Sequence, residues 1–336
     1  MRGSDDFGFA QAADLKSSEP RIRRPSTMKI VLIGQQDFGK AALEAFLARG
    51  DEVVGVFCRP EKPGTKPDAL RVEAHARGLN VLQLDKLTDQ AAHDAMQSLQ
   101  PDIGVMAYVV QFAPQSLLNI PKHGTIQYHP SLLPKYRGPS AINWAMSRGE
   151  KQTGLTIFRP SDGLDEGLVI LQKTCDIGPD ETLGELYFNK LFPMGVTALL
   201  EAADAVVAGR YTTAEQDESQ ATYEGWFQAA ESKINWANHV DVVYDLIRAC
   251  NPAPGAWTNL GDNKVFVYDC RKHRIGRYGD SKGKPGEITH IGETSIFVTS
   301  QSGQIEILKL RAEDGKKMGA ADYARAQGLA AGSKLG

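Results

Sequence analysis

Cysteine is scarce in this sequence of 336 residues, and none of its four cysteines stands in a CxxC pair. The sequence therefore lacks the cysteine spacings that are typical of zinc ribbons and redox dithiols. Four widely spread cysteines fit the reducing conditions of the cytoplasm. Long apolar runs are also lacking, because none approaches the roughly 18–20 residues that span a bilayer. These absences predict a cytoplasmic protein without a metal site or a membrane partner.

An excess of charge of either sign is missing as well, since 38 lysines and arginines face 41 aspartates and glutamates. This balance excludes a uniformly basic nucleic-acid binder and an acidic disordered chain. The glycine loop GQQDFG (34–39) lacks the GxGxxG spacing of dinucleotide-binding loops, so it is weak evidence for NAD. Neither a nucleophile elbow nor an internal repeat is apparent.

The order of apolar runs predicts an α/β fold with a doubly wound, mainly parallel sheet. Residues 1–27 have no apolar periodicity and no signal-peptide core, so we expect a disordered extension that can be removed without loss of activity. Residues 28–209 alternate short apolar runs with helical patterns, as right-handed crossovers require. Strands are expected at 29–34, 52–57, 81–84, 102–107, 125–128, 153–160 and 168–177. Helices are expected at 38–49, 69–77, 88–99 (capped by Thr88) and 140–148, and one long helix or two over 183–208.

The C-terminal third has a different pattern. Residues 210–230 are polar and uneven, which is typical of a linker. Residues 231–336 contain one helical stretch at 240–250 and then short strand-like runs at close spacing. This pattern predicts a smaller C-terminal domain, an OB-like β-barrel.

A single histidine, His129, stands at the end of an expected strand in the stretch IQYHPSLLPKYRGPSAINW. Ligands of parallel sheets bind beyond the carboxyl ends of the strands, where a histidine can act as acid or base near neutral pH. The alternative interpretation is an exposed strand end with an incidental histidine.

Two further polar residues are candidates for the same place. Asp165 lies in the glycine-flanked turn SDGLDEG between two expected strands, which can return it to the sheet edge; it could equally cap a turn or helix. Gln127 shares a strand face with His129, and its amide can donate a hydrogen bond to an oxyanion. This set favours direct acyl transfer through a tetrahedral intermediate, with no covalent enzyme and no metal.

The stretch HPSLLPKYRGPSAINWA together with DGLDEG resembles the folate-dependent formyltransferase family, and the resemblance extends from Met28 to Gly336. It implies 10-formyltetrahydrofolate as formyl donor, with the essential histidine at His129 and the essential aspartate at Asp165. It places a folate-binding turn at Ser131, Leu132, Leu133 and Pro134. It places a pterin pocket at Tyr108, Val109, Val110, Gln111, Phe112 and Ala113, with main-chain groups of Asp162 and Gly163. The segment 108–113 could also be ordinary loop packing.

The sequence departs from the family pattern twice. Gln127 stands where the family has an asparagine that donates to the oxyanion, so the same amide sits on a longer side chain. Glu166 stands where the family has a threonine after the essential aspartate.

The formyl acceptor is predicted from the second domain. Its likeness to methionyl-tRNA formyltransferases runs to the C-terminus, and the basic run CRKHRIGR (270–277) could meet phosphates or be a solvated hairpin. The runs SAINW and KLFPMG are closer to 10-formyltetrahydrofolate hydrolase domains, and the loop 59–71 is short and weakly basic for a tRNA enzyme. We therefore expect initiator methionyl-tRNA first, and water or a sugar nucleotide as alternatives. A folate- or RNA-binding module without activity is the non-enzymatic alternative, favoured only by Gln127.

Overall fold

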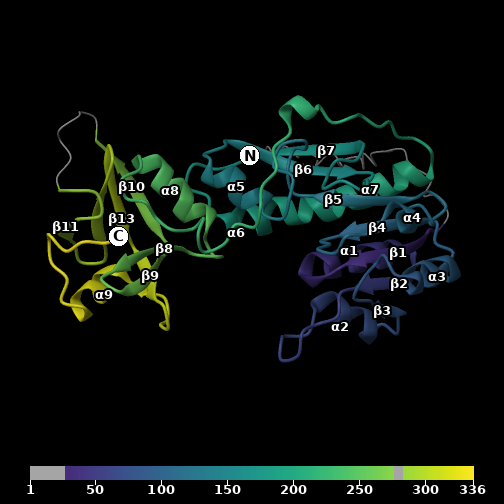
Figure 1. Ribbon diagram of the computed structural model, residues 1–336, viewed down its shortest axis with the longest axis horizontal. Coiled ribbons are helices and arrows are strands. Elements are labelled where there is room, and N and C mark those ends of the chain that lie inside the picture. The colour runs from purple at the N-terminus through teal and green to yellow at the C-terminus, as the bar shows by residue number, and fades with distance from the viewer. Residues whose placement is uncertain (1–26, 276–282) are drawn as a thin grey trace, which may run out of the picture.

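The computed structural model describes residues 27–275 and 283–336, so all but one residue of the predicted extension 1–27 lies outside the described part. The chain forms two bodies, a helix-covered sheet and a smaller antiparallel domain (Figure 1). Among the described residues no helix is both long and apolar enough to cross a bilayer.

The larger body is built on a seven-stranded sheet in the order β3-β2-β1-β4-β5-β6-β7. Its strands are β1 (Lys29–Gly34), β2 (Glu52–Cys58), β3 (Val81–Gln83), β4 (Ile103–Ala107), β5 (Thr125–His129), β6 (Gln152–Phe158) and β7 (Val169–Asp176). Strands β1 to β5 are parallel, whereas β6 runs antiparallel to both neighbours. The predicted mainly parallel sheet is confirmed.

Helices cover both faces of this sheet because its central strands are apolar on both sides. Leu32 belongs to one core with α1 (Gln36–Arg49), α2 (Ala69–Ala76) and α7 (Phe192–Val207). Its neighbour Val31 belongs to a second core with α3 (Gln90–Leu99) and α4 (Gln115–Leu118). Successive side chains of a strand point to opposite faces, so one apolar run serves two cores. The doubly wound arrangement is confirmed.

Some predicted elements differ in detail. Helix α3 begins after Asp89, so Thr88 is not its cap; the preceding Leu87 is buried in the second core and the chain turns there. Of the one long helix or two expected over 183–208, the structure has two, α6 (Leu183–Leu186) and α7, joined by a π-helical turn (Tyr187–Leu191). Pro193 lies in the first turn of α7 and has no N–H to donate, which fits a change of hydrogen-bond pattern there. Helices α4 and α9 (Ala320–Ala326) and strand β8 (Ala256–Leu260) were not predicted.

The smaller body contains two four-stranded antiparallel sheets, β10-β13-β12-β11 and β15-β14-β9-β8. The remaining strands are β9 (Asn263–Val267), β10 (Cys270–Arg274), β11 (Ile288–Ile291), β12 (Ile296–Ser300), β13 (Gly303–Ile307), β14 (Lys309–Ala312) and β15 (Met318–Gly319). The sheets continue into each other where the Leu308 N–H donates to the Asp269 carbonyl (2.8 Å). Both sheets, α8 (Val240–Ala249) and α9 enclose one core, which confirms the antiparallel C-terminal domain.

The segment between the bodies is not a loose linker. In Figure 1 the chain that follows α7 runs back across the sheet body before it reaches α8. Ala214 pairs with Val169 of β7, and Tyr223 pairs with Arg137. Helix α5 (Ala141–Ser147) also packs on α8, and the Asn143 amide donates to the Ala249 carbonyl (2.9 Å). The connecting segment is therefore fixed to the larger body, and the α5–α8 contact joins the two bodies a second time.

Candidate active site

A cavity of about 470 Å³ opens beyond the carboxyl ends of β4 and β5. Its walls come from the loop after β4, from the turn between β6 and β7, and from Trp226 of the inter-domain segment. Its strand residues are Met106 of β4, Gln127 of β5 and Phe158 of β6. Strand β4 is one of the two strands between which the strand order reverses, and ligands of such folds bind near this point. The predicted site residues that line it are Val109, Val110, Gln111, Phe112, Ala113, Gln127, Asp162, Gly163 and Asp165.

The other predicted folate residues do not line this cavity. Ser131 is fully buried and donates to the Lys135 carbonyl (2.7 Å), and the Leu133 N–H donates to Thr156 Oγ1 (3.1 Å). Ser131, Leu132, Leu133 and Pro134 thus form the turn that follows His129, and Tyr108 stands just outside the loop that lines the cavity. Direct folate contacts from these five residues stay a prediction.

The imidazole of His129 is buried at the end of β5, with 5% of the residue exposed. Its Nε2 lies 2.8 Å from the main-chain oxygen of Tyr136, and its Nδ1 lies 3.5 Å from Asp165 Oδ2. A carbonyl oxygen can only accept, so Nε2 carries a hydrogen in both the neutral and the charged ring. The ring is therefore held by the main chain of Tyr136, a contact that the sequence did not indicate.

The Asp165 carboxylate stands between His129 and the cavity. Its Oδ2 accepts a hydrogen bond from the Gly138 N–H (2.8 Å), and its Oδ1 accepts a long one from Gln127 Nε2 (3.4 Å). Asp165 and Gln127 line the cavity, whereas His129 lies in the layer behind them. The three side chains that the sequence placed at one sheet edge are therefore brought together, with Asp165 in front.

This arrangement suits the uptake of one proton. When His129 is neutral, its bare Nδ1 and the Asp165 carboxylate are both acceptors and face each other without a hydrogen between them. A proton delivered to either group lies between the ring nitrogen and the carboxylate oxygen and stabilises both. The pair can thus accept a proton from a group in the cavity and return it.

Three residues at this site have left-handed backbone conformations that side chains rarely adopt. They are Tyr108, Tyr136 and Asp165, with φ values of 62°, 59° and 55°. Such conformations are uncommon outside glycine and gather at functional sites. The Tyr136 phenol is anchored by a hydrogen bond to Glu150 (2.7 Å); burial, together with this bond, raises the pKa of Tyr136 to about 12.

Gly138 cannot be replaced without displacing the chain. Its φ is 105°, and a Cβ at this position would lie 2.1 Å from the main-chain oxygen of Glu224. Because its N–H is a hydrogen-bond donor to Asp165, the close approach of segment 222–224 and the position of the carboxylate depend on the same glycine.

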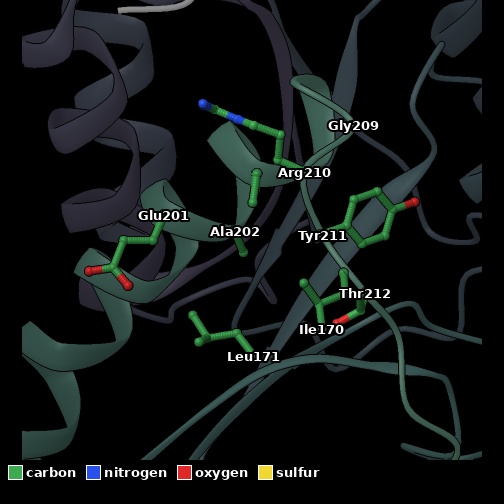
Figure 2. Close-up of a pocket in the computed structure, with 9 residues that line it drawn as sticks. Ile170, Leu171, Glu201, Ala202, Gly209, Arg210, Tyr211 and Thr212 are labelled. Atoms are coloured by element: carbon green, nitrogen blue, oxygen red, sulfur yellow. The ribbon is translucent and has the colours of Figure 1, made fainter. Parts of the chain in front are cut away.

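A second hollow, of about 560 Å³, lies between β7 and α7 and shares no lining residue with the first (Figure 2). Its floor is apolar, with Ile170, Leu171 and Ala202, and Glu201 and Arg210 stand at its rim. None of the predicted site residues lies in it. Among the described residues no group of three or more histidine, cysteine, aspartate or glutamate side chains is placed to hold a metal ion.

A ligand cavity at the carboxyl edge of a mainly parallel sheet, flanked by an imidazole–carboxylate pair, is the architecture of an α/β enzyme. Residues 28–202 match the sequence model of the family described as "Formyl transferase". Residues 227–328 match "Formyl transferase, C-terminal domain". The chain belongs to the formyl transferase family, as its resemblance implied.

Curated relatives differ in how much of their length this chain covers. It is 35% identical over 317 residues to the mitochondrial 10-formyltetrahydrofolate dehydrogenase of Homo sapiens, which is 91% of this chain and 34% of that protein. It is 32% identical over 314 residues to the methionyl-tRNA formyltransferase of Geotalea uraniireducens, which is 92% of this chain and 98% of that protein. The chain thus spans about a third of the dehydrogenases and nearly the whole of the tRNA enzyme.

Solved structures share the fold at low sequence identity. HypX from Aquifex aeolicus, solved with tetrahydrofolic acid, matches with a TM-score of 0.63 at 19% identity, over 89% of this chain and 47% of that chain. An N-formyltransferase from Helicobacter canadensis, solved with folinic acid and dTDP-3-aminofucose, matches with a TM-score of 0.65 at 17% identity, over 87% and 100%. The predicted fold class is confirmed.

Proposed function

We propose that this protein transfers the formyl group of 10-formyltetrahydrofolate to an acceptor amine, most readily the amino group of methionyl-tRNA. The observation that carries this proposal is the cavity wall on which Asp165 and Gln127 stand together, with His129 directly behind. The titratable pair and the amide donor are the groups that acyl transfer through a tetrahedral intermediate requires.

The opening of the cavity, where a folate would bind, is largely apolar. Phe112, Leu164 and Trp226 line it and remain 58%, 55% and 53% exposed. Apolar side chains gathered at a cavity mouth mark a place where a ligand covers them. We place the pterin between the loop 109–113 and the turn 160–163. The Gln111 amide donates to the Leu84 and Asp85 carbonyls (both 2.9 Å), so it braces this loop.

The proposed reaction follows from the order of the groups. The acceptor nitrogen attacks the formyl carbon and forms the new C–N bond, and the carbonyl oxygen becomes an oxyanion. The Gln127 amide donates to that oxyanion, while the proton of the attacking amine passes to the Asp165–His129 pair. The intermediate then collapses with cleavage of the bond to N10, and the pair returns the proton to the leaving tetrahydrofolate.

Methionyl-tRNA is supported as the acceptor by the extent of the similarity. The match to the Geotalea uraniireducens enzyme includes both bodies of this chain, and the C-terminal family model matches as well. An acceptor of that size would use a second domain that packs against the catalytic body through α5 and α8.

Water is the second candidate, and specific contacts favour it. Within the described part of the run 270–277, Lys272 and Arg274 pair with Asp241 (3.0 and 2.9 Å) and His273 pairs with Glu306 (2.9 Å). On the loop 59–71, Arg71 pairs with Glu61 (2.5 Å). These contacts engage part of the positive charge that a phosphate backbone would need, with the one carboxylate of Asp241 serving both Lys272 and Arg274.

Tetrahydrofolate release from 10-formyltetrahydrofolate separates these functions. The protein is assayed alone, with charged initiator tRNA, and with an amino-sugar nucleotide, and His129→Ala is the inactive control. A rate that requires methionyl-tRNA supports the proposal, and an equal rate without acceptor supports hydrolysis. Folate binding without turnover in every mixture would leave only a binding module and refute the proposal.

A further inference from the structure

The buried guanidinium of Arg137 lies at the centre of a cluster that joins three parts of the chain. Arg137 is fully buried, with no exposed side-chain surface. It donates through Nη2 to Gln216 Oε1 (2.8 Å) and Glu218 Oε1 (2.6 Å), through Nη1 to Glu218 Oε2 (3.0 Å), and also to the Tyr223 hydroxyl. We name Arg137, Glu166, Gln216, Glu218 and Tyr223 the Arg137 cluster.

The neighbours of Arg137 hold the two reactive side chains. The carbonyl of Tyr136 accepts from His129 Nε2, and the N–H of Gly138 donates to Asp165 Oδ2 (both 2.8 Å). A shift of Arg137 therefore moves the main-chain partners of both His129 and Asp165.

The cluster also holds the Asp165 turn from the other side. Gln216 Nε2 donates to the main-chain oxygens of Asp165 and Gly167 (both 2.8 Å), and the Tyr223 hydroxyl donates to Glu166 Oε1 (2.7 Å). Three successive residues of the turn are thus bound by one segment, and the first of them has the unfavourable φ of 55°. A left-handed aspartate persists only where its surroundings fix it.

We propose that Arg137 and Gln216 are positioning residues for formyl transfer, which fix the Asp165 carboxylate between His129 and the cavity. The inference rests on the function proposed above, because it names residues that serve the same site. Glu166 strengthens the cluster, since a threonine at this position is too short to reach the Tyr223 hydroxyl in the same way.

The experiment uses Gln216→Leu, Gln216→Glu and the matched control Gln220→Leu in the full chain. Gln216→Glu retains an acceptor for Arg137 but loses the donation to the turn, whereas Gln220 lies exposed in the same segment. Both Gln216 variants should lose kcat by roughly 10- to 100-fold, the size expected when a reacting group is displaced by about 1 Å. Their KM for the donor should stay close to that of Gln220→Leu, and both variants should fold with a melting temperature lowered by the lost hydrogen bonds.

A second measurement does not depend on activity. Hydrogen exchange of the Gly138 amide reports its bond to Asp165, and this exchange should become faster in both Gln216 variants than in Gln220→Leu. Gln216 variants with the kcat of the control, or with an unchanged Gly138 amide, would overturn the inference. A wild-type chain that turns over no 10-formyltetrahydrofolate would refute the proposed function instead, and Gly138 exchange would still test the positioning.

Discussion

Replacing Asp165 by asparagine tests the proton-accepting pair directly, because the change removes a charge and almost no volume. Asp165 Oδ2 lies 3.5 Å from His129 Nδ1, and the two side chains are only 7% and 6% exposed. At an effective dielectric constant of about 20, unit charges at this distance attract by about 5 kcal/mol. The Gly138 and Gln127 donors share the carboxylate charge, so about 3–4 kcal/mol is the stabilisation at stake for the protonated pair.

Each 1.4 kcal/mol of transition-state stabilisation is worth about a factor of ten in rate, so Asp165→Asn should lower kcat by roughly 10²- to 10³-fold. The Kd for tetrahydrofolate should change little, because the asparagine oxygen can still accept from Gly138. Single-turnover release of tetrahydrofolate gives the chemical rate, and calorimetry gives the Kd.

The control is Glu306→Gln, which breaks another histidine–carboxylate pair (2.9 Å to His273) in the C-terminal domain. At saturating acceptor this control should keep the wild-type chemical rate, because Glu306 lies on β13 and not at the cavity. If Asp165→Asn turned over as fast as Glu306→Gln, the carboxylate would not take part in proton transfer, and the order of groups at the cavity would have no catalytic meaning.

Three further predictions concern the cavity wall, the turn at Gly138 and the loop 59–71. Trp226 is half exposed on the cavity wall, so tetrahydrofolate should change tryptophan fluorescence, and Trp226→Phe should remove most of that change. Gly138→Ala should lower activity and melting temperature together, because its Cβ would meet the Glu224 oxygen at 2.1 Å; a fully active variant would show that the turn can open. Hydrogen bonds from the Asp68 N–H and from Arg71 lower the pKa of Glu61 to about 2. Because this folded-state pKa is depressed, the contribution of Glu61 to stability is present above about pH 4.5 and lost as pH falls toward 2. Acid unfolding of Glu61→Gln should therefore be less steep in this interval, and an unchanged curve would contradict the assignment.

The parts of the site that sequence could predict are those that strand geometry fixes. Gln127 and His129 are two residues apart on β5, so their side chains lie on the same face of the sheet. The glycine-flanked turn between β6 and β7 returns Asp165 to them. Residue types and spacing therefore made the three side chains candidates for one place. The family resemblance then assigned the essential residues to His129 and Asp165.

The contacts that sequence missed are made by main-chain groups and by residues without a periodic pattern. The carbonyl of Tyr136 reaches His129 because Tyr136 adopts a left-handed conformation, which no residue preference indicates for a tyrosine. Gln216 lies 51 residues beyond Asp165 in a polar segment that had the composition of a linker. Such a segment is held in place by hydrogen bonds to the turn and not by an apolar face. Its sequence therefore has no apolar periodicity from which its position could be predicted.

The position of Asp165 also explains why the residues of the sequence motifs do not indicate which formyl acceptor the protein uses. In the proposed reaction, an amine or a water molecule that attacks the formyl group would meet the same carboxylate in front of the same imidazole, so Asp165 and His129 would serve either nucleophile. Discrimination must then come from surfaces that the acceptor touches away from the formyl carbon, such as the loop 59–71 and the C-terminal domain. Since Glu61 pairs with Arg71 on that loop, and the single carboxylate of Asp241 pairs with both Lys272 and Arg274, we expect the acceptor preference to depend on carboxylates outside the motif. Removing those carboxylates should therefore strengthen the electrostatic attraction of a polyanionic acceptor and leave the chemistry proposed for Asp165 unchanged.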